Sequence, residues 1–471
     1  MNCIQYYYDL FGVTKPQLDE LTATALRHGG DYADLYFEYT TYFNLLLKDG
    51  VVSSGGFHTD FGVGIRVLKG EKTGYAYSEN TEMPDMIKAA KAASAIALGS
   101  SSSLSYVNVS DPHHNFYPTP DNWRAKDAQT LLPFLNSLEK AIFEKDNRIV
   151  KVIARLSDSV SDVMMYNSLG ELTCDSRPMG SVTATAIFQQ NGKTENKTVS
   201  KSFRHGSEMI CQSLIEEIAN EIVADIDARF EATRPKGGQM NVVMGAGASG
   251  ILLHEAMGHA FEADFNRKGQ SIFSEKMGMQ VCPKGVSVVD DGTLLWNRGA
   301  GNHDDEGVPG EKTYMVKDGV LNSYLHDRIS AAYYGVKPTG NGRRENFRYN
   351  PIPRMRATYM ENGDSDPESI IASVKNGVYV DEFSNGQVKI GEGDFTFYVK
   401  SGYMIENGRL TAPVKDINII GNGPQALSDI LAVGNDLKID NGTWTCGKEQ
   451  SVPVSCGMPT VLISSLTVGG E

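Results

Sequence analysis

The spacing of apolar residues predicts that the first half of the chain consists of helices packed on strand hairpins. An amphipathic pattern at 15–28, ended by Gly29-Gly30, is typical of a helix. Alternating apolar and β-branched residues then predict four strands, at 32–40, 42–48, 61–68 and 73–77. A second helix, rich in Ala and Lys, is expected at 84–98.

A similar order of elements follows a connector at 100–121 that contains Ser, His and Pro. We expect helices at 127–144 and 208–229, with four strands between them, at 150–157, 162–167, 181–190 and 193–202. The repeated order suggests an internal duplication, although no repeat is visible residue by residue.

The second half of the chain is predicted to be rich in β-strands. The turn-rich segment TRPKGG at 233–238 marks a boundary, and a buried strand is expected directly after it, at 240–244. Further strands are predicted at 286–289, 313–316, 378–380, 395–399, 417–420 and 460–463. We therefore expect an α+β, mostly antiparallel protein of two domains, an N-terminal domain at 1–235 with helices on strand hairpins and a β-rich C-terminal domain at 236–471.

Composition and charge narrow the class of protein. The chain has 471 residues, of which 41% are hydrophobic and 22% charged, a globular composition. Its net charge is −14 and it has no run of Lys and Arg, so we expect no direct contact with nucleic acid. Residues 1–13 lack the basic and apolar regions of a signal peptide, and no long apolar run occurs. These features predict a cytoplasmic protein without a membrane partner.

One apolar segment, SGILLHEAMGHAFEADF at 249–265, contains residues that can bind a metal and transfer a proton. Its His254, Glu255 and His259 form HExxxH, in which two imidazoles can hold Zn²⁺ and a carboxylate can take a proton from water. Residues five apart on a regular helix diverge by roughly 140°, so the two His would not share a face. We therefore predict a helix stop or a π-type turn at Gly258.

Two other interpretations compete with a metal site here. The same residues could form an ordinary core helix in which both His are satisfied internally. The glycines of GAGASG at 245–250 also match GxGxxG, but no second strand ending in an acidic residue follows the helix. We expect these glycines to let the helix pack closely on its strand.

A third metal ligand is not settled by residue chemistry. Candidates are Glu262, Asp264, Cys282, Cys446 and Cys456. The six cysteines form no CxxC pair and are expected to be reduced. Cys446 lies between glycines with Lys448 two residues on, where a cation could lower the pKa of a thiol. The residues alone leave Cys446 and Glu262 nearly equal.

Several motifs together resemble the TldD/PmbA family of metallopeptidases. They include HEAMGHAFEADFNRKGQS, DDEGVPG at 304–310, PTGNGRRE at 338–345, VGNDLKIDNG at 433–442 and CGKEQSVPVSCGMPT near the end. LLLKDGVV and FGVGIRVLKGEKTGYAY extend the resemblance to the N-terminal part. The HExxxH motif resembles the TldD-type branch, since PmbA-type members lack it.

The resemblance implies a zinc-dependent peptidase. It implies Zn²⁺ held by His254, His259 and Cys446, with Glu255 as the general base toward a metal-activated water. Peptides or unfolded polypeptide segments are the implied substrates, and the implied assembly is a homodimer or a heterodimer with a PmbA-type subunit. The alternative is a non-catalytic modulator or binding subunit with a structural zinc site, which a closed set of four protein ligands would favour.

Two polar segments outside the motif carry weaker predictions. Arg343 and Arg344 could bind a substrate carboxylate or polarise a carbonyl, or could lie in a solvated loop with structural ion pairs. The acidic run at 304–306 beside His303 could support the zinc ligands, or could be an exposed turn.

Overall fold

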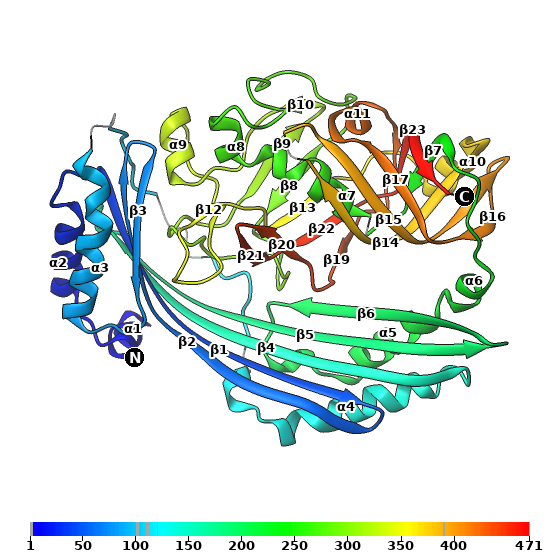
Figure 1. The fold of residues 1–471 in the computed structure, drawn as a ribbon, viewed down its shortest axis with the longest axis horizontal. Helices are drawn as coiled ribbons and strands as arrows, with labels where there is room; N and C mark the ends of the chain where they lie inside the picture. The colour runs from blue at the N-terminus through cyan, green and yellow to red at the C-terminus, as the bar shows by residue number, and fades with distance from the viewer. Residues whose placement is uncertain are drawn as a thin grey trace.

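The computed structural model describes residues 3–99, 103–109, 114–119, 121–247, 249–389 and 391–470. A six-stranded antiparallel sheet occupies the first half, in the order β3-β2-β1-β4-β5-β6 (Figure 1). Its strands are β1 (Tyr32–Lys48), β2 (Val51–Lys69), β3 (Lys72–Ser78), β4 (Ile149–Asn167), β5 (Leu172–Gln190) and β6 (Lys193–Phe203). Its helices are α1 (Cys3–Phe11), α2 (Lys15–Leu26), α3 (Met83–Ser94), α4 (Ala128–Phe143), α5 (Gln212–Val223) and α6 (Ile226–Glu231).

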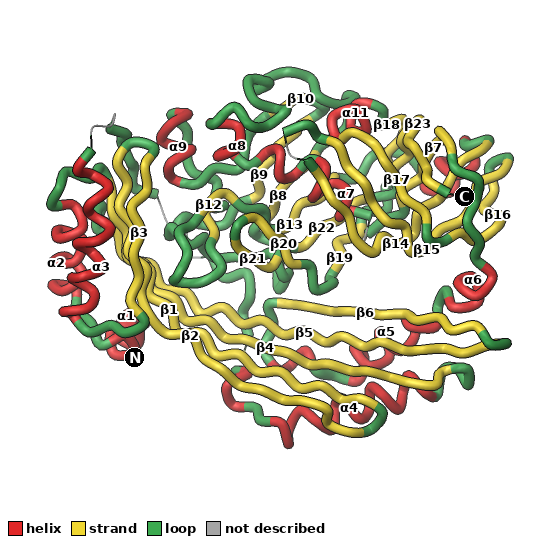
Figure 2. The backbone as a smooth tube through the Cα atoms, viewed as in Figure 1, coloured by secondary structure: helices red, strands yellow, loops and turns green. Residues whose placement is uncertain are grey.

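The two central strands are longer than their sequences predict. The sequence predicts breaks at residue 41 and at 158–161, but β1 and β4 run through them without interruption (Figure 2). The two strands pair with each other from Asp34↔Asn167 to Lys48↔Ile153, and each has a second neighbour on its other side. Both edges of each strand are hydrogen-bonded through the backbone. The polar Ser and Asp side chains, which point away from these hydrogen bonds, therefore do not interrupt the strand.

Helices cover the two halves of this sheet separately. In Figure 1, α2 and α3 lie against the end of the sheet that holds β3, whereas α4 packs on β1 and β4 and α5 on β5 and β6. Leu18, Leu21 and Met86 belong to the first core, and Leu135, Leu138 and Ile218 to the second. The predicted order of helix, strands and helix is confirmed in both halves. The helix expected at 208–229 is wrong in extent, because it breaks between α5 and α6.

The described part of the second half contains two large sheets and two two-stranded sheets, β11-β12 and β20-β21. One large sheet has the order β10-β9-β8-β13-β22-β19, and the other contains β14-β7-β23-β17-β15-β16 with β18 beside β23. Only β13–β22 and β14–β7 pair in parallel among their described strands. The α+β, mostly antiparallel prediction is therefore confirmed. The two-domain division with a boundary at 235 stays a prediction.

The strands of this half are β7 (Gly238–Met244), β8 (Val288–Asp291), β9 (Lys312–Lys317), β10 (Val320–Leu321), β11 (Gly342–Arg343), β12 (Ile352–Pro353), β13 (Ala357–Met360), β14 (Asn376–Val388), β15 (Asp394–Glu406), β16 (Arg409–Val414), β17 (Ile417–Asn422), β18 (Ile430–Val433), β19 (Lys438–Asp440), β20 (Thr445–Lys448), β21 (Gln450–Pro453), β22 (Ser455–Met458) and β23 (Val461–Gly469). Its helices are α7 (Gly250–Ala256), α8 (Ala263–Arg267), α9 (Arg328–Tyr334), α10 (Pro367–Ser373) and α11 (Gly423–Ser428). None of the described helices combines the length and apolar character needed to cross a bilayer.

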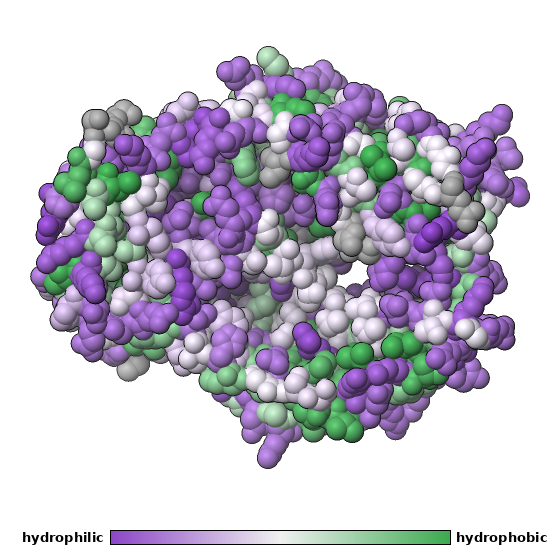
Figure 3. All heavy atoms as spheres, in the orientation of Figure 1, coloured by the Kyte–Doolittle hydropathy of each residue, from purple (hydrophilic) through white to green (hydrophobic). Residues whose placement is uncertain are grey.

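Buried ion pairs fasten the first sheet to the second half of the chain. Glu306 lies 2.6 Å from Arg66 of β2, and Asp305 pairs with Arg177 of β5. Glu306 and Asp305 are both buried, so the exposed-turn interpretation of 304–306 is wrong. Their partners are arginines rather than candidate zinc ligands, which also argues against the alternative interpretation. The space-filling view shows a hollow between the first sheet and the second half, bordered mainly by pale and purple residues (Figure 3).

Close packing at Gly250 gives a test of the fold. A Cβ at this position would lie 2.5 Å from the backbone nitrogen of Gly457, which cannot move without shifting β22. We expect Gly250→Ala to destabilise the protein by about 1–3 kcal/mol, measured by denaturant unfolding. Gly469→Ala is the matched control, since its Cβ would meet neighbours only at 3.5 Å or beyond. Equal stability of the two variants would contradict this packing.

Candidate metal centre

The turn before α7 uses glycines to bring the helix against neighbouring strands. Gly247 has a φ of +101°, a conformation that favours glycine, and Gly250 lies against the backbone of β22. The helix that follows is buried, and Leu252 and Leu253 have no exposed surface. The predicted close packing is confirmed for Gly250, but its partner is β22 rather than the preceding strand β7.

The helix ends between the two histidines. α7 stops at Ala256, Met257 has φ −131° and ψ −45°, and a 3₁₀ turn covers Gly258–Phe261. This confirms the predicted helix stop at Gly258. The change of direction brings the rings of His254 and His259 to 5.3 Å between centroids, at an interplanar angle of 80°. The two imidazole rings of HExxxH can therefore reach one metal ion despite the five-residue spacing.

His254, His259 and Cys446 form one buried group. One ligand atom of each residue lies within 4.8 Å of the others, and Sγ of Cys446 is 3.2 Å from Nε2 of His259. Neither ring nitrogen of His254 has a hydrogen-bond partner among the described residues, although the side chain is fully buried. The interpretation of an ordinary core helix with both His satisfied is therefore wrong for His254.

Glu262 lies behind His259 rather than in the group. Its Oε2 is 2.9 Å from Nδ1 of His259 and 3.1 Å from Nζ of Lys448. Burial alone would raise the pKa of Glu262, but Lys448 and His259 outweigh it and hold the pKa at about 2. A carboxylate that accepts a proton from Nδ1 leaves the lone pair of Nε2 facing Cys446. The sequence marks Glu262 only as a possible ligand.

Lys448 has a different role from the one its sequence position suggests. Its Nζ donates to Asp264 at 2.7 Å and pairs with Glu262, so it neutralises carboxylates. Burial raises the pKa of Cys446, while His254 and His259 lower it, and the result is about 4. Cys446 is therefore expected to be a thiolate at neutral pH. The peptide oxygen of Cys446 also accepts from Arg354 at 2.6 Å, which holds the backbone at this residue.

The remaining candidate ligands lie outside the group. Among the described residues, the group has three members, so Asp264, Cys282 and Cys456 do not belong to it. Burial raises the pKa of Cys282 to about 12 and that of Cys456 well above its usual value, which keeps both as thiols. The residues that the structure describes therefore offer three grouped ligand atoms.

Glu255 is the carboxylate beside this group that retains solvent access. Its Oε2 is 3.9 Å from Nε2 of His259, and the side chain is 25% exposed. Two imidazole nitrogens, one thiolate and an adjacent carboxylate suit a borderline-soft divalent metal such as Zn²⁺. The unpartnered nitrogens of buried His254 fit such a metal, because otherwise they would remain unsatisfied.

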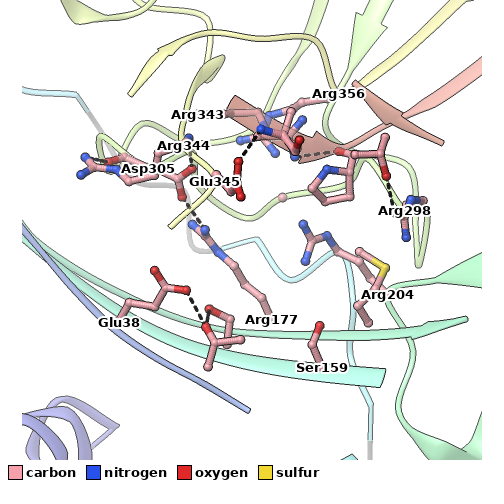
Figure 4. A pocket seen from close by; sticks show the side chains of 18 of the residues that line it. Glu38, Ser159, Arg177, Arg204, Arg298, Asp305, Arg343, Arg344, Glu345 and Arg356 are labelled. Carbon is pink, nitrogen blue, oxygen red and sulfur yellow. Dashed lines mark hydrogen bonds and ion pairs between the residues drawn. The ribbon is translucent and has the colours of Figure 1, made fainter. Parts of the chain in front are cut away.

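Arg343 and Arg344 do not lie in a solvated loop. Both are buried and line a cavity of 340 Å³ between the first sheet and the second half (Figure 4). Arg344 donates to the backbone oxygen of Asp305 at 2.9 Å, and Arg343 donates to the backbone oxygen of Pro453 at 2.8 Å. Neither belongs to the candidate metal group.

Comparison with known proteins gives consistent matches along the chain. Family models described as PmbA/TldA metallopeptidase domain 1, central domain and C-terminal domain match residues 33–97, 121–227 and 237–470. A "Metalloprotease TldD homolog" of Haemophilus influenzae is 38% identical over 449 residues, covering 93% of each chain. One of Buchnera aphidicola is 35% identical and covers 96% of this chain and 95% of the relative. A "Zinc metalloprotease TldD homolog" of Saccharolobus solfataricus is 30% identical over 53% of this chain and 57% of its own.

Solved structures share the fold. A Thermotoga maritima protein, described as a proposed modulator of a DNA gyrase, has a TM-score of 0.79 at 24% identity, covering 96% of this chain and 99% of its own. TldE of Thermococcus kodakarensis has a TM-score of 0.76 at 18% identity, covering 96% of this chain and all of its own. At these identities the likeness concerns the fold alone.

The carboxylate behind His259 can be tested by substitution. Glu262→Gln removes the negative charge that orients His259, and we expect Zn²⁺ affinity to fall about 10- to 100-fold. The measurement is a competition titration of the purified protein against a zinc chelator, with circular dichroism to confirm folding. Glu368→Gln, an exposed change on α10, is the control. Unchanged affinity in Glu262→Gln would contradict the assigned role.

Proposed function

This chain belongs to the PmbA/TldD family of metallopeptidases, and we propose that it is a zinc-dependent peptidase. The observation that carries the proposal is the buried group of His254, His259 and Cys446, with Glu255 beside it. The names of the relatives support metalloprotease activity in general. The metal and the role of each residue belong to the proposal.

We assign His254, His259 and Cys446 as the ligands and Glu255 as the general base. Bound zinc would supply Lewis acidity, lowering the pKa of water and polarising the scissile carbonyl. Glu255 accepts the proton of the attacking water and delivers it to the leaving amine. Glu262 holds the tautomer of His259, and Lys448 neutralises Glu262, so that the buried carboxylates do not repel one another.

The substrates we propose are peptides or unfolded polypeptide segments, acted on by a dimer. A peptide must reach a group whose three members are buried, and an extended chain can do so more readily than a folded domain. The dimer is a homodimer or a heterodimer with a PmbA-type subunit, and the fold that the chain shares with TldE is compatible with the heterodimer. The cytoplasmic location expected from the sequence is part of the same proposal.

The alternative, a non-catalytic modulator with a structural zinc site, is less well supported. A structural site closes with four protein ligands, whereas three are grouped among the described residues. Glu262 is bound to His259 and Lys448, and Cys456 lies outside the group. A structural site would also have no use for Glu255.

The proposal is tested by metal content and cleavage of an unfolded polypeptide, measured on the same samples. We expect about one zinc per chain, and loss of both zinc and activity in His259→Ala and Cys446→Ala. Glu255→Gln should keep its zinc and lose activity by about 100-fold or more, because only the proton transfer is removed.

Other results would redirect the assignment. Zinc retained in Cys446→Ala would move the third ligand elsewhere. Full peptidase activity of zinc-loaded Glu255→Gln would contradict the mechanism, and stoichiometric zinc without any cleavage would favour the modulator.

A further inference from the structure

The cavity between the two halves of the molecule is lined by arginines. Its floor consists of β1, β4 and β5, including Glu38 and Ser159, and its opposite wall belongs to the second half (Figure 4). Arg177 and Arg204 project into this space, with Arg343 and Arg356 on the facing side. At 340 Å³, the cavity can hold a small ligand or the end of a peptide.

Four of these arginines have no carboxylate partner within the described ranges of the chain. Arg204, Arg298, Arg343 and Arg356 are each at most 9% exposed, yet among the described residues none has an ion pair within 4.0 Å. Nε of Arg204 and Nη2 of Arg356 have no hydrogen-bond partner at all in the described part of the chain. Burial lowers the pKa of Arg298, and Arg204 lowers it further, to about 10, so the group remains charged at neutral pH. Buried, uncompensated guanidinium groups are costly to the fold.

Among the described residues, the carboxylates that line the cavity form no ion pair within 4.0 Å with these four arginines, and Glu345 accepts the backbone N–H of Ser451 at 2.6 Å. Asp305 is taken by Arg177, and both oxygens of Asp304 accept backbone N–H groups, including that of Gly342 at 2.9 Å. Burial raises the pKa values of Glu38 and Asp158 to about 7, so both are partly protonated at neutral pH. Among the described lining residues, six arginines face five carboxylates, two of which are partly protonated, so the cavity holds an excess of positive charge.

The cavity adjoins the candidate metal centre through one hairpin. Thr445 and Val452 line the cavity, and Cys446, the residue after Thr445, pairs with Val452 across β20 and β21. Arg298 donates from Nε to the oxygen of Trp444 at 2.9 Å, and Arg343 donates to Pro453 of the same hairpin. A ligand held by these arginines would thus lie next to the strand that carries Cys446.

We propose that this cavity is a carboxylate-binding subsite of the peptidase, in which Arg204, Arg298, Arg343 and Arg356 bind a carboxylate of the peptide substrate. The inference rests on the proposed peptidase function. Guanidinium groups bind carboxylates through paired, charge-assisted hydrogen bonds, and a bound carboxylate would supply the missing counter-charge. The carboxylate comes from the C-terminus of the peptide or from an acidic side chain.

The test compares four peptides that differ only in their carboxylates. They are N-acetylated tetraalanine as the free acid, its C-terminal amide, and this amide with one Ala replaced by Glu or by Gln. Binding to zinc-loaded Glu255→Gln protein is measured by calorimetry, which needs no turnover. We expect the free acid to bind about tenfold or more tightly than the amide if the C-terminus is recognised. A similar preference for the Glu peptide over the Gln peptide would identify an acidic side chain.

Arg204→Met in the same background locates the site. The variant should abolish the carboxylate preference, and its melting temperature without peptide should rise or stay unchanged, because an unpaired buried charge is removed. Arg409→Met, an exposed change on β16, should do neither. A preference that persists in Arg204→Met would overturn the proposal.

Equal binding of all four peptides to the Glu255→Gln protein would overturn the proposal as well. No cavity residue is substituted in this comparison, so misfolding of a cavity variant cannot explain the result. Failure of the proposed peptidase function would appear separately, as zinc-loaded wild-type protein that cleaves no peptide while the binding preference remains measurable.

Discussion

The contact between the buried carboxylate of Glu262 and His259 is the interaction on which the candidate centre depends. Glu262 is fully buried, and such a charge is tolerated only because Lys448 and His259 lie 3.1 Å and 2.9 Å from it. The same contact fixes which nitrogen of His259 faces Cys446. Lys448 comes from the strand that also carries Cys446, so one ion pair joins the residue after the 3₁₀ turn to the hairpin of β20 and β21.

The sequence predicts the two His ligands and the helix break between them, but not the residues that support these ligands. The five-residue spacing of His254 and His259 requires a broken helix, and the break occurs beside Gly258, which helical geometry alone predicts. The part played by Glu262 could not be predicted, because a carboxylate three residues after a His can bind a metal or support the ring. Only the position of Lys448, which is distant in sequence, distinguishes the two.

Long-range pairing explains the other differences. The acidic run at 304–306 is buried because Arg66 and Arg177 form ion pairs with it. Both arginines come from strands more than a hundred residues earlier, so the local sequence does not predict these contacts. β1 and β4 exceed their predicted lengths because each is paired on both sides, which outweighs the low strand propensity of the Ser and Asp residues in β4. Arg343 and Arg344 were expected at a binding site or in a solvated loop, and they lie in a cavity wall whose binding role remains a proposal.

The measurement that tests the central claim most directly is zinc K-edge X-ray absorption spectroscopy of the purified protein. The assignment of His254, His259 and Cys446 predicts one sulfur ligand at about 2.3 Å and nitrogen or oxygen ligands at about 2.0–2.1 Å, with imidazole scattering from two rings. A first shell without sulfur, or one with two sulfurs, would contradict the assignment of Cys446 as the single thiolate ligand and the open site that the proposed peptidase requires.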